Sequence, residues 1–136
     1  MTPGEYRKAA DSKEISIYDM QHVSAYEGLV SKAQRHGKQQ SEVDALIRWL
    51  TGYTQEQFES MLNAGISYQA FFEKAPQINP DAWKIRGVIG GMRVERIEEP
   101  LMQQIRWLEK LVDDLVRGKL DPDFFAKGSM TIDAAP

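Results

Sequence analysis

A succession of helix start and stop signals runs through this chain and constrains its fold more than any other feature. Three hydroxyl side chains each stand three residues before a polar partner, in the pairs Ser24 and Glu27, Ser41 and Asp44, and Thr54 and Gln57. The three segments end in glycines, which are Gly37, Gly52 and Gly65. Hydroxyls accept hydrogen bonds from the free amides of a first turn, and glycine adopts the left-handed conformation that closes a helix. The pattern predicts an all-α protein built from short helices.

Apolar periodicity supports the same fold class and predicts a long helix near the C-terminus. In the second helix the apolar side chains recur with the spacing of one helical face, at Val43, Leu46, Ile47 and Leu50. The last helix is expected to begin with Glu99 and Pro100 and to end at Gly118, with apolar steps of four and three between them. We expect further short helices at about residues 25–36, after Thr54 and after Ser67. Together with a helix near residue 85, the pattern predicts a compact single-domain bundle of about six helices.

The glycine-rich segment from residue 79 to residue 97 permits two interpretations. Asn79 followed by Pro80 is a typical helix start, and the spacing of Ile85, Val88, Ile89 and Met92 is that of a helical face. We favour a helix that ends near Gly90 or Gly91. The alternative is a short β-hairpin at residues 85–97, in which Gly90 and Gly91 form a two-residue turn.

Composition and charge bound the domain organisation and exclude several function classes. Residues 1–14 are polar and unpatterned and are expected to form a tail, residues 15–119 the helical domain, and residues 120–136 a C-terminal tail with at most one short helix. The net charge of −3 argues against nucleic-acid binding, and the absence of cysteine excludes disulfides and thiolate chemistry. No apolar run has the length of a membrane span and the start lacks an export pattern, so we expect a cytoplasmic protein that does not bind membranes.

The densest charge cluster, RVERIEE at residues 93–99, is a candidate ligand site. Arg93 and Arg96 are suited to bind a carboxylate or phosphate. The carboxylates Glu95 and Glu99 lie beside them, and Glu95 or Glu98 is the candidate general base. The alternative is that these charges pair with one another on a solvated helix surface. No histidine lies nearby to complete a metal site, and the glycines lack the spacing of a phosphate-binding loop. We therefore expect neither a metal nor a cofactor.

Large aromatic side chains indicate a candidate interface. Trp49 and Trp107 fall beside the apolar stripes of their helices, where half-exposed tryptophans often line subunit contacts. With Leu108 on the long last helix, they form the predicted interface. The alternative is that the two rings cover the edge of the core.

Ordered motifs along the chain resemble a bacterial family known as domain of unknown function 2200. They are WLTGYT, then FFEKAP followed by NP, then RVERIEEPLMQQIRWLEKLVDDLVRGK, and the resemblance covers roughly residues 15–119. The chain departs from the family pattern at Gly90, Glu99 and Trp107, where the family has cysteine, aspartate and tyrosine. The resemblance implies no activity, but it directs attention to the positions that match its densest motif: Arg93, Glu95, Glu99, Pro100, Arg106, Lys110 and Asp114.

Two functions follow from these patterns. The first is a non-catalytic interaction module that self-associates or binds a protein partner through a surface near Trp107 and the long last helix. The second is a binder of a small molecule or anion, or an enzyme, whose site lies around Arg93 and the turn at Gly90 and Gly91.

Overall fold

The computed structural model describes residues 22–120 and is mostly α-helical, with a long C-terminal helix, as the sequence predicts. The described residues form five α-helices: α1 (His22–Arg35), α2 (Gln40–Thr51), α3 (Gln55–Asn63), α4 (Tyr68–Glu73) and α5 (Pro100–Val116). Between α4 and α5 lie two 3-10 turns and two short strands: η1 (Ala82–Lys84), β1 (Val88–Ile89), β2 (Met92–Arg93) and η2 (Val94–Arg96). The predictions for residues 1–14 and for nearly all of residues 120–136 lie outside the described part of the chain.

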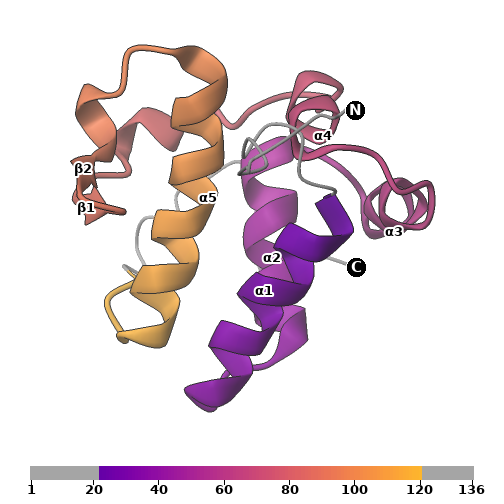
Figure 1. Ribbon diagram of the computed structural model, residues 1–136, viewed down its shortest axis with the longest axis horizontal. Coiled ribbons are helices and arrows are strands. Elements are labelled where there is room, and N and C mark those ends of the chain that lie inside the picture. Colours follow the sequence, from indigo (N-terminus) through magenta and orange to yellow (C-terminus); the bar gives the residue numbers. More distant parts are fainter. Residues whose placement is uncertain (1–21, 121–136) are drawn as a thin grey trace, which may run out of the picture.

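Three helices form the centre of the molecule. α1, α2 and α5 contact one another pairwise, α3 and α4 lie on one side of them, and the two strands lie on the other side of α5 (Figure 1). Side chains from all of these parts meet in one core, including Leu46 of α2, Phe58 of α3 and Leu108 of α5, which are fully buried. The fold therefore places the strands at the periphery, with α5 as their support.

Two of the predicted hydroxyl caps form as expected. The Thr54 hydroxyl accepts a hydrogen bond from the Gln57 amide at 3.1 Å, and the Gln57 side chain accepts one from the Thr54 amide at 2.9 Å. Ser67 accepts from the amide of Ala70 at 3.0 Å and starts α4. These reciprocal bonds satisfy amides that have no partner inside the helix.

The other two predicted starts are wrong by two to three residues. α1 begins at His22, so Ser24 lies inside the helix. α2 begins after Gln39, whose amide donates to the Glu42 carboxylate at 2.8 Å, and Ser41 stands in the first turn. A carboxylate in the first turn also complements the helix dipole. The pair Gln39 and Glu42 therefore caps this helix in place of Ser41 and Asp44.

The C-terminal end of α2 is capped by the loop that follows α4 in the chain. The amides of Gln77 and Asn79 donate to the carbonyls of Thr51 and Leu50, and the Asn79 side chain donates to the carbonyl of Trp49. Gly52 has φ +80°, and a Cβ atom there would lie 2.9 Å from the Gln77 carbonyl oxygen. The loop thus satisfies the last carbonyls of the helix, and only glycine allows its close approach.

The favoured helix near residue 85 is wrong, and the alternative hairpin forms. Gly90 and Gly91 have φ values of +60° and +81°, as the two central residues of a type I′ turn require. β1 and β2 pair antiparallel, with Val88 opposite Arg93 and Ile89 opposite Met92. We call residues 82–97 the hairpin lobe. The Asn79 side-chain oxygen accepts a hydrogen bond from the Asp81 amide at 2.8 Å, as at a helix start, while its side-chain amide donates to α2. Only the 3-10 turn η1 follows, and the chain then enters the hairpin.

Candidate functional site

The hairpin lobe is fastened to α5 by its inner side chains. Ala82, Ile85 and Val94 are buried in the common core, and Ile89 and Ile97 are half-buried against it. The Gln103 side chain on α5 donates a hydrogen bond to the carbonyl of Val94 at 3.0 Å. These contacts make the lobe a fixed part of the fold.

Two long cationic side chains of α5 lie against glycines of the lobe. A Cβ atom on Gly87, where φ is +123°, would lie only 2.5 Å from the Lys110 side chain. A Cβ atom on Gly90 would lie 3.5 Å from a nitrogen of the Arg106 guanidinium. Glycine at position 87 therefore lets the backbone pack directly on Lys110, whereas a Cβ atom at position 90 would make an ordinary contact with Arg106. The family resemblance also singles out Lys110 and Arg106.

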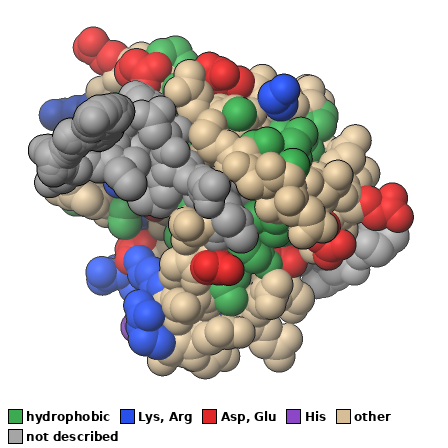
Figure 2. All heavy atoms as spheres, turned by 45° about the vertical axis from the view of Figure 1, so that its right-hand side comes forward, with side chains coloured by type: hydrophobic (Ala, Val, Ile, Leu, Met, Phe, Trp, Pro, Cys, Tyr) green, Lys and Arg blue, Asp and Glu red, His purple; other side chains and the backbone are tan. Residues whose placement is uncertain are grey.

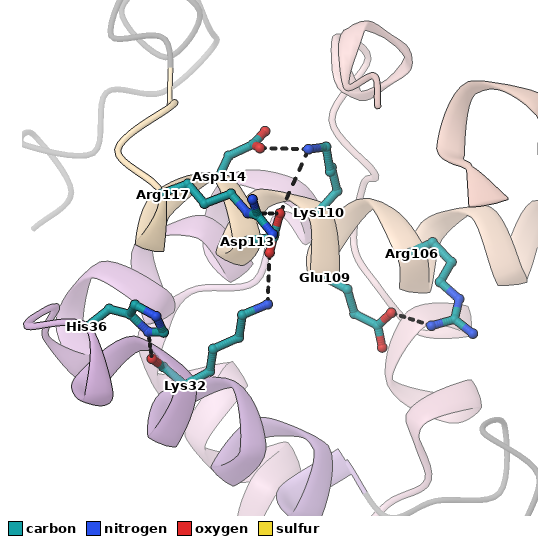
Figure 3. Close-up of polar contacts among 8 residues, drawn as sticks. All are labelled: Lys32, His36, Arg106, Glu109, Lys110, Asp113, Asp114 and Arg117. Carbon is teal, nitrogen blue, oxygen red and sulfur yellow. Dashed lines mark hydrogen bonds and ion pairs between the residues drawn. The ribbon is translucent and has the colours of Figure 1, made fainter. Parts of the chain in front are cut away.

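The same face of α5 carries a row of ion pairs (Figure 3). Arg106 pairs with Glu109 at 2.5 Å, and Lys110 pairs with Asp114 at 2.8 Å. Both pairs join residues three or four positions apart on one helix. Such pairs stabilise a helix by a few tenths of a kcal/mol each, about 0.2–0.5. We assign them a structural role.

Asp113 joins this row to α1. Its carboxylate accepts a hydrogen bond from Lys32 of α1 at 3.1 Å and lies 2.9 Å from the Arg117 guanidinium (Figure 3). Burial raises the pKa of Asp113, but the hydrogen bonds from Lys32 and Arg117 outweigh this and hold the pKa below its ordinary value of 3.8. Asp113 thus links α5 to α1 through an ion pair with Lys32.

The predicted ligand residues are only partly brought together. The Arg93 guanidinium pairs with Glu95 at 2.6 Å, and Glu95 also accepts a hydrogen bond from the Gly87 amide at 3.0 Å. The bond from Gly87 first, and then that from Arg93, lower the pKa of Glu95 to about 2. A carboxylate with so low a pKa is a weak proton acceptor at neutral pH, which argues against Glu95 as a general base.

The other two predicted ligand residues do not join this pair. Glu99 is the N-cap of α5, and its carboxylate accepts from the amides of Met102 at 2.8 Å and Leu101 at 3.4 Å. Arg96 is exposed and forms no ion pair with another described residue. The geometry therefore supplies one surface ion pair and one helix cap in place of a four-residue site.

The three predicted interface side chains lie in the core. Trp49 is 2% exposed, Leu108 is fully buried, and Trp107 is 9% exposed. This burial corrects the expectation that the two tryptophans are half-exposed, because packing from helices distant in sequence covers the flanks of their apolar stripes. Association through the surrounding surface stays a prediction.

The structure exposes large apolar side chains that the sequence patterns do not single out. Trp83 is 59% exposed, Val88 49% and Met92 40%, and all three belong to the hairpin lobe. Helical spacing places Val88 and Met92 on a buried face together with Ile85 and Ile89. In the hairpin, Val88 and Arg93 share one face, and Met92 shares the other face with the half-buried Ile89. The hairpin interpretation therefore indicates the exposure of Val88, whereas the exposure of Met92 depends on tertiary packing.

Positive charge surrounds these exposed side chains. The lobe holds four basic side chains and one acidic one, a net charge of +3, while the whole chain carries −3, so the rest carries −6. The ammonium group of Lys84 lies 5.7 Å from the centre of the Trp83 ring. Like Arg96, Arg86 is exposed and forms no ion pair with another described residue. The lobe is therefore both apolar and basic on an acidic protein.

Comparison with known proteins gives the family. The pattern described as "Uncharacterized protein conserved in bacteria (DUF2200)" matches residues 16–124. This chain belongs to the DUF2200 family. The structure of this DUF2200 protein is similar to the "Crystal structure of uncharacterized protein SP1917", with 37% sequence identity and a TM-score of 0.76 over 88% of this chain and 96% of the other. No curated protein matches the sequence.

Within residues 22–120, no group of three or more His, Asp and Glu side chains is arranged to hold a metal ion. None of the helices in the same range combines the length and the apolar character needed to cross a membrane.

Proposed function

We propose that this DUF2200 protein is a non-catalytic interaction module that self-associates through its hairpin lobe. The observation that carries the proposal is the exposure of Trp83, Val88 and Met92 on one small, basic lobe. Among the described residues, these are the large hydrophobic side chains with the greatest exposure.

Physical chemistry favours an interface for such a surface. Exposed apolar side chains rimmed by polar ones are typical of protein-binding sites, and tryptophan and arginine are enriched among the residues that dominate binding energy. The lobe presents Trp83, Arg86 and Arg96 to solvent. The two guanidinium groups form no ion pair with another described residue that a partner carboxylate would have to displace.

The lobe is also prepared for binding because its backbone is held in place. Buried Ile85 and Val94 fix its inner side to α5, and the turn at Gly90 and Gly91 sets the pairing of its strands. A surface that is rigid before binding loses little conformational entropy on association. The alternative, an anion site at Arg93, has less support because Glu95 already occupies that guanidinium.

Sedimentation equilibrium over a range of protein concentrations tests the proposal. Trp83→Ala and Met92→Ala should each weaken self-association at least about fivefold, the effect of losing about 1 kcal/mol at a contact. Met61→Ala, a half-buried methionine on α3, is the matched control and should leave self-association unchanged. Circular dichroism of each variant checks that the fold persists.

Two results would overturn the proposal. One is a wild-type protein that stays monomeric up to concentrations of about 1 mM, the weakest association that a functional self-contact would need. The other is an association that Trp83→Ala and Met92→Ala leave as strong as in the wild type.

A further inference from the structure

The geometry points to the receiving surface: the hairpin lobe of one copy docks into the groove between α4 and α5 of a second copy. This inference rests on the proposed function, since it names the partner surface for the same lobe. The contact joins two different surfaces, so that the copies associate head to tail.

The groove has the right chemistry for the lobe. It has a volume of about 540 Å³ and lies between α4, the loop that follows it and the start of α5. Its walls include the apolar side chains Phe72, Ile78 and Leu101, and its acidic side chains are Glu73 and Glu99. Among the described residues, no lysine or arginine lines it. The groove is therefore apolar and negative where the lobe is apolar and positive.

Size supports the same pairing. Sites that enclose whole small ligands range from about 300 to about 1,000 Å³, so this groove has room for a large aromatic side chain and a neighbouring guanidinium. Trp83 and Arg86 stand three residues apart on the lobe and are both exposed. We place the Trp83 ring against the half-buried Ile78 and Leu101, and the Arg86 guanidinium beside the Glu73 carboxylate.

Charge excludes the symmetric arrangement in which two lobes meet each other. Each lobe carries +3, and like charges brought together at an interface repel each other. The rest of the chain carries −6, so a surface of opposite sign is found only outside the lobe. A head-to-tail contact leaves one lobe and one groove open at the ends, and the assembly therefore closes into a ring or continues as a chain.

Charge exchange between the two surfaces tests the inference. The lobe variant Arg86→Glu/Arg96→Glu and the groove variant Gln69→Lys/Glu73→Lys each place like charges on both sides of the contact. Each variant alone should lose self-association at least about tenfold. An equimolar mixture should associate again, because the lobe of the groove variant and the groove of the lobe variant are both unaltered. Native mass spectrometry, with one variant isotope-labelled, identifies the mixed dimer.

The controls separate this inference from the proposed function. Arg35→Glu/Lys119→Glu reverses two exposed charges outside both surfaces and should associate like the wild type. If the lobe variant is monomeric but the groove variant associates normally, the groove is overturned and the lobe keeps its proposed role. A mixture that stays monomeric also overturns the lobe-to-groove contact. If neither variant differs from an associating wild type, both the proposed function and the inference fail.

Discussion

Single glycines decide the local structure of the lobe. Gly90 and Gly91 adopt the left-handed conformations of the turn, and Gly87, at φ +123°, accepts the Lys110 side chain where a Cβ atom would stand. Side chains other than glycine reach such backbone regions only at a cost of about 1–3 kcal/mol. The same glycines that weaken a helix are therefore required by the hairpin.

The substitution Gly87→Ala should destabilise the protein by about 1–3 kcal/mol, because it adds backbone strain and displaces Lys110. Gly91→Ala is the matched control: it also has positive φ, but no atom lies within 4 Å of its Cβ position, and its cost should be only about 1 kcal/mol. Urea unfolding measures both. Equal losses for the two variants would contradict the close contact with Lys110.

At the scale of secondary structure, α5 is the element on which the others converge. Its N-terminus is capped by Glu99, its middle supports the lobe, and its last turns are joined to α1 through Lys32 and Asp113. Because Asp113 is buried, loss of its charge leaves two cationic partners without a carboxylate. The link between the first and last helices is therefore expected to matter more than the ion pairs within α5.

Asp113→Asn should lower the free energy of unfolding at pH 7 by about 1.5–3 kcal/mol, the range for hydrogen bonds to charged groups. The pKa of Asp113 is lowered in the folded state, so its contribution is present above about pH 3.8 and is lost as the pH falls below that value. The difference between wild type and variant in urea unfolding should shrink over that acidic range. Asp114→Asn, which removes a pair within α5 only, should cost less than about 1 kcal/mol. A larger loss for Asp114→Asn would contradict this assignment.

At the scale of the whole molecule, charge is unevenly distributed. The lobe carries +3 and the rest −6. Figure 2 shows the side on which α3 and α4 lie, where Asp and Glu side chains are spread over the upper and right-hand parts and Lys and Arg gather mainly at the lower left. A molecule with separated charges attracts a second copy in a preferred orientation and repels it in others.

Self-association should therefore weaken as salt rises. As NaCl is raised from about 0.05 M to about 0.5 M, charge interactions are screened over ever shorter distances. At about 0.5 M their range is well below the roughly 10 Å found at about 0.1 M. Light scattering or sedimentation should show a falling association constant for the wild type. Arg86→Ala/Arg96→Ala should associate more weakly and respond less to salt. An association that strengthens with salt would indicate an apolar contact without a charge contribution.

Much of the helical framework could be predicted because its signals are local. A hydroxyl cap such as Thr54 and a glycine stop such as Gly52 act within one turn, and the apolar face of α2 follows from spacing alone. The errors occur where a local signal competes with a distant one. Asn79 has the sequence of a helix start, and its side-chain oxygen accepts from the Asp81 amide, yet only a 3-10 turn follows. Its side-chain amide also donates to the carbonyl of Trp49, thirty positions earlier in the chain.

The candidate site depended on tertiary structure to a greater degree. The sequence placed Arg93 and Glu95 together, since two positions separate them, but assigned Trp107 to a surface and Met92 to a buried face. Burial depends on which element packs against which, and spacing within one segment does not contain that information.

The sequence by itself determined the fold class, the long last helix and the family. For the glycine-rich segment it left two conformations open, a helix and a hairpin. Local capping, periodicity and the conformational freedom of glycine are sufficient for these. Only the tertiary structure decided that the segment is a hairpin, that Trp49 and Trp107 belong to the core, and that Trp83 is exposed on a basic lobe. The reason is that α2 and α5 supply the hydrogen bonds and the packing surface that the segment requires, and these helices are distant from it along the chain.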